Sequence, residues 1–182
     1  MDGKNLAGYV LVQASWGIRF PKIAEERHAV PALDEIDRRI LRLLQDDATL
    51  STQALADAAG LSSSPAWRRL RRLTEDGVIQ RQVAIVAPAK AGLHAMAHVQ
   101  VSLLDHTEAT LARFDRFVQS EDQIMECATI TGTSDYQLKI VAADPEGLEH
   151  FLMRRMLPLG IIRSTVTHFV LRQTKYRTAL PV

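Results

Sequence analysis

Four arginines within a stretch of five residues form the most distinctive chemical cluster in the sequence. They are Arg68, Arg69, Arg71 and Arg72, and three serines and a proline closely precede them. A guanidinium presents several N–H donors in a rigid fork, which fits the two acceptors on a guanine edge or the oxygens of a phosphate. The formal net charge of the chain is only +1, so this local cluster would have to attract an anionic partner.

Apolar spacing sets the orientation of the arginine-rich segment. Ala66, Leu70 and Leu73 recur at i, i+4 and i+7, which predicts a helix with an inward apolar side and arginines on its remaining surface. A recognition helix turns its N-terminal residues toward base edges, while phosphate contacts fix its register. We therefore predict DNA contacts from Ser62, Ser63, Ser64, Pro65, Arg68, Arg71, Arg72 and Arg81. Of these, Ser63, Ser64 and Arg68 are assigned to base edges. The phosphate contacts are assigned to Arg71, Arg72 and Arg81.

Two helices and a tight turn are predicted in front of the arginine-rich helix. The apolar stripe of residues 36–44 predicts the first, beginning near Asp34, and Ser51 can cap the second, over 52–59. Gly60 supplies the left-handed backbone conformation that a tight turn requires. This order of elements predicts a helix-turn-helix.

The basic helix has a second interpretation, in which its arginines only form a solvated surface. Arg69 or Arg72 would then pair with Glu75 or Asp76. The glycine turn in front of the helix makes DNA binding the favoured hypothesis. After the helix, residues 78–86 are predicted to form a short strand pair or wing.

From residue 95 the apolar period changes to two, which predicts a strand over 95–103. The predicted elements that follow are a helix over 108–120, strands over 124–131 and 136–143, a helix starting at Pro145, and a strand over 161–173. This βαββαβ order is the ferredoxin-like arrangement. The last strand is apolar or β-branched on both sides, with Ile162, Val166 and Val170 on one of them. We therefore expect an apolar sheet face that a second copy covers in a homodimer.

The turn between the two middle strands combines a glycine with several polar side chains. Its residues are Thr131, Gly132, Thr133, Ser134 and Asp135. A glycine lets the backbone approach a ligand closely, and exposed turn amides bind anions. Asp135 could accept hydrogen bonds from an ammonium group, so we predict that this loop binds a small effector such as an amino acid. The alternative is a plain hairpin turn in which Asp135 satisfies its own backbone.

Both halves of the chain resemble the Lrp/AsnC family of transcription regulators. In the first half the resemblance lies in residues 33–41, Leu55-Ala56, Gly60-Leu61-Ser62, Pro65, residues 69–73 and Gly77-Val78-Ile79. In the second half it lies in Glu126-Cys127, residues 131–136 and Leu138. It extends from about residue 33 to 176, and it implies a winged helix-turn-helix followed by the family's regulatory domain, known as the RAM domain. It also implies an amino-acid effector near the glycine loop and homodimers that can assemble into tetramers or octamers.

The sequence departs from the family pattern at one place. Thr133 and Ser134 stand where many relatives carry an acidic or aromatic residue, so the identity of the effector is not carried over. The tail over residues 174–181 and the start of the arginine-rich helix are most similar to cysteine-responsive members of the family.

The predicted fold class is α+β, and the chain is divided into five parts. They are a poorly structured extension (1–32), a winged helix-turn-helix domain (33–82), a linker (83–93), a ferredoxin-like effector-binding and dimerisation domain (94–176) and a tail (177–182). An upstream start codon would account for the extension. The only cysteine, Cys127, is expected in the core of a protein from the reducing cytoplasm. We predict no catalytic residue, no metal, no cofactor and no membrane span.

Two rival functions remain open at this point. An enzyme similar to sirohaem decarboxylases would use histidines of the second domain, but strand spacing puts His94 and His98 about 13 Å apart, too far to share a metal. A non-specific architectural protein would need a broader basic surface. We therefore predict a sequence-specific transcription regulator rather than an enzyme.

Overall fold

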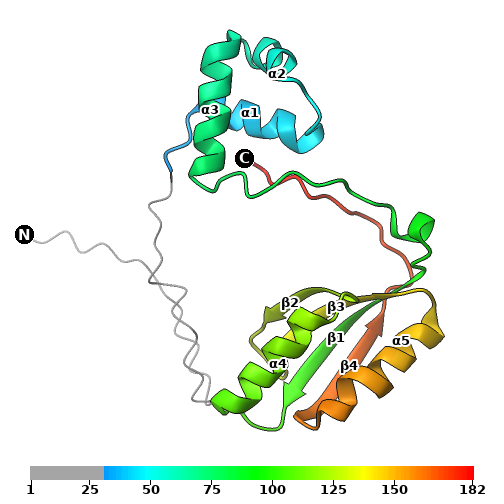
Figure 1. Cartoon of the computed structure of the whole chain (residues 1–182). Coiled ribbons are helices and arrows are strands. Elements are labelled where there is room, and N and C mark those ends of the chain that lie inside the picture. The colour runs from blue at the N-terminus through cyan, green and yellow to red at the C-terminus, as the bar shows by residue number, and fades with distance from the viewer. Residues whose placement is uncertain (1–30) are drawn as a thin grey trace, which may run out of the picture. The chain divides into compact units, whose positions relative to one another are not determined.

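The computed structural model describes residues 31–182, which divide into two compact units (Figure 1). The first, called the helix-turn-helix unit below, contains residues 31–86 and 172–182. The second, called the sheet domain, contains residues 87–171. The extension predicted for residues 1–32 lies outside the described residues, except for its last two positions. Within residues 31–182, every helix is too short or too polar to cross a membrane.

Three helices make up the helix-turn-helix unit, with bounds close to those predicted. They are α1 (Glu35–Asp46), α2 (Thr52–Ala59) and α3 (Ser63–Glu75). Local side chains fix where the first two begin. The Asp34 carboxylate accepts from the N–H of Asp37, whose own carboxylate accepts from the N–H of Asp34. The Ser51 hydroxyl accepts from the N–H of Ala54, and Gly60 ends α2 with the predicted left-handed conformation, at a φ of 72°.

Side chains from all three helices form the apolar core of this unit. Ile40 on α1, Leu55 on α2 and Leu73 on α3 are almost completely buried. Burying a side chain of this size contributes about 1.5–3 kcal/mol. Ala59 and Ala66 are buried as well, and their small side chains let the helices approach closely. The core therefore holds one side of α3 against α1 and α2.

Residues 80–87 leave the helices as an extended segment without a partner strand among the described residues. Of the strand pair or wing predicted over residues 78–86, the strand pair does not form within residues 31–182. A hairpin needs a turn at its centre, and residues 78–86 contain no Gly, Pro, Asn or Asp that would form one.

The sheet domain has the predicted βαββαβ order. Its elements are a 3-10 turn (Pro88–Ala91), β1 (Ala95–Leu103), α4 (Glu108–Ser120), β2 (Ile124–Thr129), β3 (Tyr136–Ala142), α5 (Pro145–Phe151) and β4 (Ile162–Phe169). A π turn (Leu152–Met156) and a 3-10 turn (Leu157–Leu159) continue α5. The strands form one antiparallel sheet in the order β2-β3-β1-β4. Helices α4 and α5 cover one face of it, and Phe114 and Phe151 pack there on buried β1 side chains such as Val99 (Figure 1).

The face of the sheet without helices, called the open face below, is more polar than predicted. Side chains of β1 alternate between buried and half-buried, and His98 and Gln100 belong to the half-buried set. Because β4 pairs with β1 in register, His168 lies opposite His98 and Val166 opposite Gln100. Val166 is the apolar residue of β4 on this face, and it is 48% exposed.

Two predictions for the sheet domain are wrong. Ile162 was predicted on the same side of the last strand as Val166, but it packs against the core while Val166 lies on the open face, because the pairing register shifts between Ser102 and Leu103. Cys127 was expected in the core, but it is exposed on β2. This strand is at the edge of the sheet.

Candidate functional site

The start of α3 presents small polar groups directly after the Gly60 turn. Ser62 is the N-cap residue, but its hydroxyl makes no cap hydrogen bond, and Ser64 is exposed. The Ser63 hydroxyl instead donates to the side-chain oxygen of Gln53 on α2. Within the described part of the chain, two of the three predicted serine hydroxyls are therefore left without a hydrogen bond that ties them to the protein.

Arg68 is the most available of the predicted DNA-binding arginines. It is exposed, one turn into α3, and it makes no ion pair or side-chain hydrogen bond with any residue from 31 to 182. Together with Pro65, Arg69 and Arg72 it lines a depression of about 320 Å³. The Arg68 guanidinium has no partner inside the described protein. When a bound molecule covers it and displaces its water, an anion or a hydrogen-bond acceptor of that molecule has to replace the lost hydrogen bonds.

Arg71 and Arg81 are also exposed, but their surroundings differ. Arg71 pairs with Glu75 at 2.6 Å, and its guanidinium lies 5.4 Å from the ring centroid of Trp67. Both partners of the ion pair are about three-fifths exposed, so the pair is weak and can exchange for a phosphate. Arg81 lies in the extended segment after α3.

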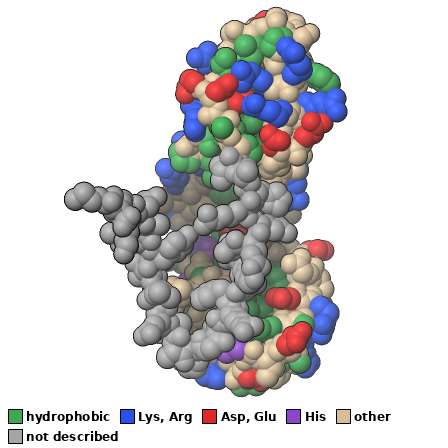
Figure 2. Space-filling view, turned by 90° about the vertical axis from the view of Figure 1, so that its left-hand side faces the viewer, with side chains coloured by type: hydrophobic (Ala, Val, Ile, Leu, Met, Phe, Trp, Pro, Cys, Tyr) green, Lys and Arg blue, Asp and Glu red, His purple; other side chains and the backbone are tan. Residues whose placement is uncertain are grey.

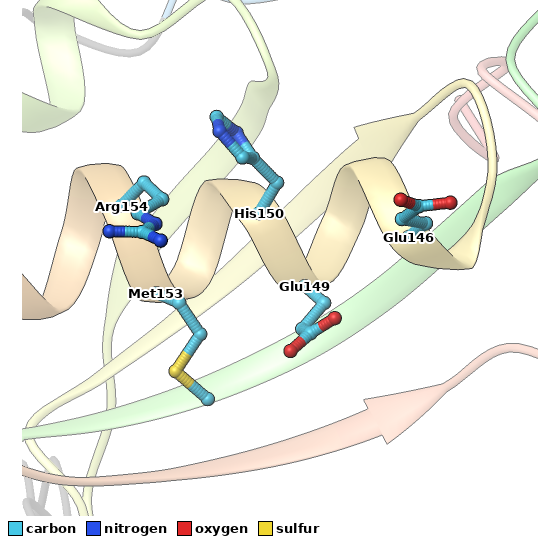
Figure 3. Close-up of a pocket in the computed structure, with 5 residues that line it drawn as sticks. All are labelled: Glu146, Glu149, His150, Met153 and Arg154. Carbon is cyan, nitrogen blue, oxygen red and sulfur yellow. The ribbon is translucent and has the colours of Figure 1, made fainter.

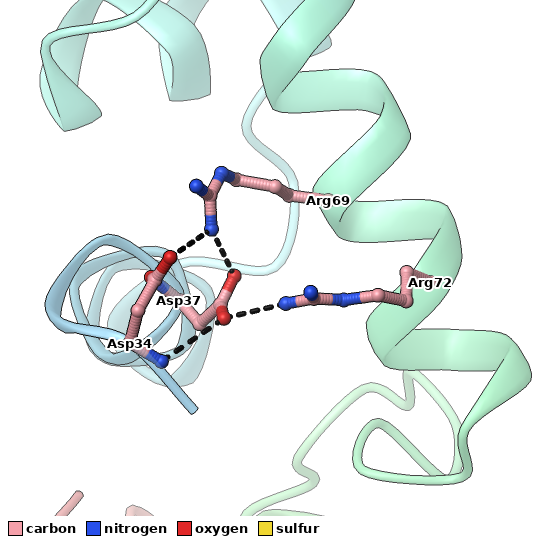
Figure 4. Close-up of polar contacts among 4 residues, drawn as sticks. All are labelled: Asp34, Asp37, Arg69 and Arg72. Carbon is pink, nitrogen blue, oxygen red and sulfur yellow. Dashed lines mark hydrogen bonds and ion pairs between the residues drawn. The ribbon is translucent and has the colours of Figure 1, made fainter. Parts of the chain in front are cut away.

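Arg69 and Arg72 turn toward α1, where both reach the carboxylate of Asp37 (Figure 4). Nη1 of Arg69 lies 2.8 Å from Asp37 Oδ1 and 2.6 Å from Asp34 Oδ2, and Nη2 of Arg72 lies 2.5 Å from Asp37 Oδ2. The Asp37 side chain is only 1% exposed. The hydrogen bond from the Asp37 N–H, aided by Arg69, lowers the pKa of the Asp34 carboxyl. The local acids expected for Arg69 and Arg72 are therefore not their partners, and Glu75 pairs with Arg71 instead.

The charge on the helix-turn-helix unit is mixed rather than uniformly basic. In Figure 2, Lys and Arg side chains are spread over its visible surface with Asp and Glu between them. A surface of this kind attracts DNA weakly at long range, so the contacts of a few arginines have to provide the affinity.

The predicted effector loop follows β2 and is held by the carboxylate and backbone of Asp135. Oδ2 of Asp135 accepts from the N–H of Leu103 at 2.7 Å, and the Asp135 N–H donates to the carbonyl of Val101 at 2.9 Å. Gly132 has a φ of 127°, a conformation that L-residues rarely adopt. Asp135 thus ties the loop to the backbone of β1 rather than satisfying its own turn, and Thr131, Thr133 and Gly132 are exposed at the tip.

His106 is a residue of this loop region to which the sequence assigned no role. Its Nε2 lies 3.0 Å from Oδ1 of Asp135, and this nitrogen is buried without a hydrogen bond of good geometry. A ligand with a hydrogen-bond acceptor could provide the hydrogen bond that this buried nitrogen lacks. The sequence carries no local signal for this role of His106, because the contact joins residues from two different connections of the fold.

A second depression, of about 500 Å³, lies on α5 and not at the predicted loop. Glu146, Glu149, His150, Met153 and Arg154 line it (Figure 3). All five belong to one helical segment, and Met153 and Glu149 point to one side while His150 points to another (Figure 3). It therefore lacks the converging polar groups that define a ligand site.

Histidines of the sheet domain are arranged differently from the pair considered in the sequence. His94 precedes β1, whereas His98 lies directly opposite His168 on β4. Within residues 31–182, groups of three or more potential metal ligands are absent. The sequence could not have shown the opposition of His98 and His168, because it depends on the register of two strands far apart in the chain.

Comparisons with known proteins agree for both units. Residues 33–80 match a family model described as winged helix-turn-helix DNA-binding, and residues 96–180 match one described as the Lrp/AsnC ligand binding domain. The chain is 35% identical over 150 residues to the DNA-binding transcriptional activator DecR of Escherichia coli K12, a match that covers 82% of this chain and 99% of that protein.

Solved structures give the same result. An AsnC family transcriptional regulator from Agrobacterium tumefaciens is 36% identical, with a TM-score of 0.78 and coverage of 82% of this chain and 97% of that one. A transcriptional regulator from Neisseria meningitidis, solved in complex with L-Met, is 29% identical, with a TM-score of 0.80 and the same coverage. The chain therefore belongs to the Lrp/AsnC family and is a transcription regulator of that type.

Proposed function

We propose that this regulator binds a specific operator through the exposed side of α3, with Arg68 at a base edge. The observation that carries the proposal is the state of Arg68, which is exposed at the start of the helix and lacks an internal partner. Ser62, Ser64 and Pro65 lie beside it, and Arg71 and Arg81 are placed to reach phosphates. Arg72 was predicted at a phosphate as well, but its pairing with Asp37 favours a structural role.

Arg68→Ala and Arg72→Ala form a matched pair that separates the two roles. Arg68→Ala should cost about 1–3 kcal/mol at the preferred sequence and flatten the preference for it, while the folded unit keeps its stability. Arg72→Ala should lower the stability of the helix-turn-helix unit and leave the base preference intact. Operator titrations at fixed salt, with specific and random DNA, measure the base preference of each variant, and thermal unfolding measures its stability. An equal loss of affinity for both kinds of DNA in Arg68→Ala would refute the assignment.

We further propose that the loop of residues 131–135 binds a small effector, an amino acid, whose carboxylate meets the turn amides. The solved relative from Neisseria meningitidis carries L-Met, which supports an amino acid as the class of ligand. Gly132 allows the close approach, and Thr131, Thr133 and Ser134 supply hydroxyls. One oxygen of Asp135 lies toward His106 and can accept from the ammonium group.

A thermal melting screen against the twenty amino acids tests this proposal, because a ligand selective for the folded state raises its melting temperature. Gly132→Val should abolish the shift, since valine is strained at a φ of 127°. Gly92→Val, at a φ of 81° outside the loop, is the matched control for strain alone. A shift that survives in Gly132→Val would place the ligand elsewhere.

We propose a cytoplasmic homodimer that packs through the open face of the sheet and can assemble further into tetramers or octamers. Half-buried side chains on β1 and the exposed Val166 on β4 support a partner on this face. Val166→Glu should dissociate the dimer in sedimentation equilibrium. Met153→Glu, at a similarly exposed residue of the helix side, should not. Dissociation by the second variant alone would move the interface to the helices.

A further inference from the structure

The last residues of the chain return to the helix-turn-helix unit and contact α1. The side-chain amide of Gln45 makes two hydrogen bonds to the backbone of Leu180: its Nε2 donates to the Leu180 carbonyl at 3.2 Å, and its Oε1 accepts from the Leu180 N–H at 2.5 Å. Nη1 of Arg42 donates to the main-chain oxygen of Val182 at 2.9 Å. These contacts join residues that are 135 and 140 positions apart in the chain.

The hydrogen bonds of Gln45 copy those of a neighbouring β-strand. A strand partner offers one donor and one acceptor to the same residue, and the amide of Gln45 does so with a single side chain. Recognition of this kind reads the backbone of Leu180, after which the chain turns at Pro181, where the Val182 N–H donates to the Leu180 carbonyl at 2.9 Å. Pro181 follows Leu180, and its restricted φ reduces the number of conformations that the tail loses when it docks.

An apolar contact and an oriented arginine complete the site. Val182 is half-buried against the core cluster of the helix-turn-helix unit, which includes Ile40. Nη2 of Arg42 pairs with Glu35 at 2.6 Å, so its Nη1 is held toward the tail. The hydrogen bond from Arg42 also lowers the pKa of the Glu35 carboxyl.

The tail changes how the two units are connected. Residues 80–87 form an extended segment that is exposed on nearly its whole length, and such a link alone permits wide rotation. Residue 170 still belongs to the sheet domain, where the Val170 N–H donates to Met96 at 2.9 Å. Residues 172–182 belong to the helix-turn-helix unit. We propose that α1 carries a docking site for residues 180–182, and that the docked tail is a second connection which limits the motion of the helix-turn-helix unit relative to the sheet domain.

Hydrogen exchange of the full chain tests the docking. The Leu180 amide should be protected in the unaltered protein, and its exchange should become at least about tenfold faster in Gln45→Ala and in Arg42→Ala. Arg38→Ala is the matched control, because Arg38 is an exposed arginine of α1 that makes no hydrogen bond to the tail. An unprotected Leu180 amide in the unaltered protein would overturn the docking site.

A peptide of residues 176–182 provides an independent measurement. It should shift the α1 resonances of a chain that stops at residue 179, but only at about millimolar concentration, because the attached tail itself acts at an effective concentration of that order. The same peptide should not shift these resonances in the intact chain, where the tail already occupies the site. If the intact chain bound the peptide as strongly as the shortened chain does, docking of the tail would be contradicted.

Rotational correlation times test the second connection. In the unaltered protein the amides of the two units should report nearly one correlation time. In Arg42→Ala combined with Gln45→Ala, the helix-turn-helix unit should tumble faster, by roughly a third, while the sheet domain is unchanged. If the double variant loses protection of the Leu180 amide but neither correlation time changes, the docking site is supported and the second connection is overturned.

Discussion

Replacement of Asp37 by alanine tests whether the ion-pair network between α1 and α3 holds the recognition helix in place. Asp37 is 1% exposed and accepts hydrogen bonds from the Asp34 N–H, from Arg69 and from Arg72. Removal of one partner from a buried ion pair costs about 3–5 kcal/mol. Arg69 and Arg72 are 28% and 48% exposed, so water can replace part of what they lose. We therefore expect a loss below this range, about 2–3 kcal/mol, for Asp37→Ala.

Thermal unfolding of the helix-turn-helix unit measures this loss. A destabilisation of that size lowers the melting temperature of a small unit by roughly 10–20 °C. Glu75→Ala is the control, because it breaks the exposed pair with Arg71 and should cost at most about 0.5 kcal/mol. Asp37→Asn keeps the shape but removes the charge, and we expect an intermediate loss. Equal melting temperatures for Asp37→Ala and Glu75→Ala would refute the argument that this network fixes α3.

Three further predictions concern single groups. Gly60→Ala should lower the stability of the helix-turn-helix unit by about 1–2 kcal/mol in urea unfolding, because a non-glycine residue is strained at a φ of 72°. The lowered pKa of Asp34 adds stability that is present above its ordinary value of 3.8 and is lost as the pH falls through the folded value, so Asp34→Asn should flatten the acid limb of the melting profile. Partial burial, with Asp115 nearby, raises the pKa of the Cys127 thiol from 9.0 to about 11, so at pH 8 its alkylation by iodoacetamide should be about a hundredfold slower than that of an unshifted thiol.

The helix-turn-helix could be predicted from the sequence because its signals are local. The caps at Asp34 and Ser51 and the turn at Gly60 each depend on side chains within three or four residues, so residue types at short spacing identify them. The partners of Arg72 could not be predicted in this way. Asp37 lies 35 positions earlier in the chain, and the pair forms only after α1 and α3 have packed.

Long-range register also explains what the sequence missed in the sheet domain. The period-two pattern identified β1 and its buried side, since alternation is a property of one strand. It could not show that β4 shifts its pairing near Leu103, which turns Ile162 toward the core. Nor could it show that His106 approaches Asp135, because these residues come from different connections of the fold.

Because the arginines have different roles, we expect a particular dependence of the DNA affinity on salt concentration. If every arginine from 68 to 72 contacted a phosphate, together with Arg81, a dimer would neutralise about ten phosphates, and the logarithm of its affinity would fall with the logarithm of salt concentration at a slope of about −9. Arg69 and Arg72 are occupied by Asp37, however, and Arg68 is assigned to a base.

Arg71 and Arg81 alone leave about four phosphates for a dimer, which gives a slope of about −3.6. Asp37→Asn releases the Arg72 guanidinium, while Arg69 keeps its pair with Asp34. The variant should therefore reach about six phosphates per dimer and steepen the slope to about −5.4, even though it destabilises the unit. Titration of operator DNA at several salt concentrations, below the melting temperature of the variant, measures both slopes. A slope near −9 for the unaltered protein would show that the pairs with Asp37 break on binding, and that the structural role assigned to Arg72 does not persist on DNA.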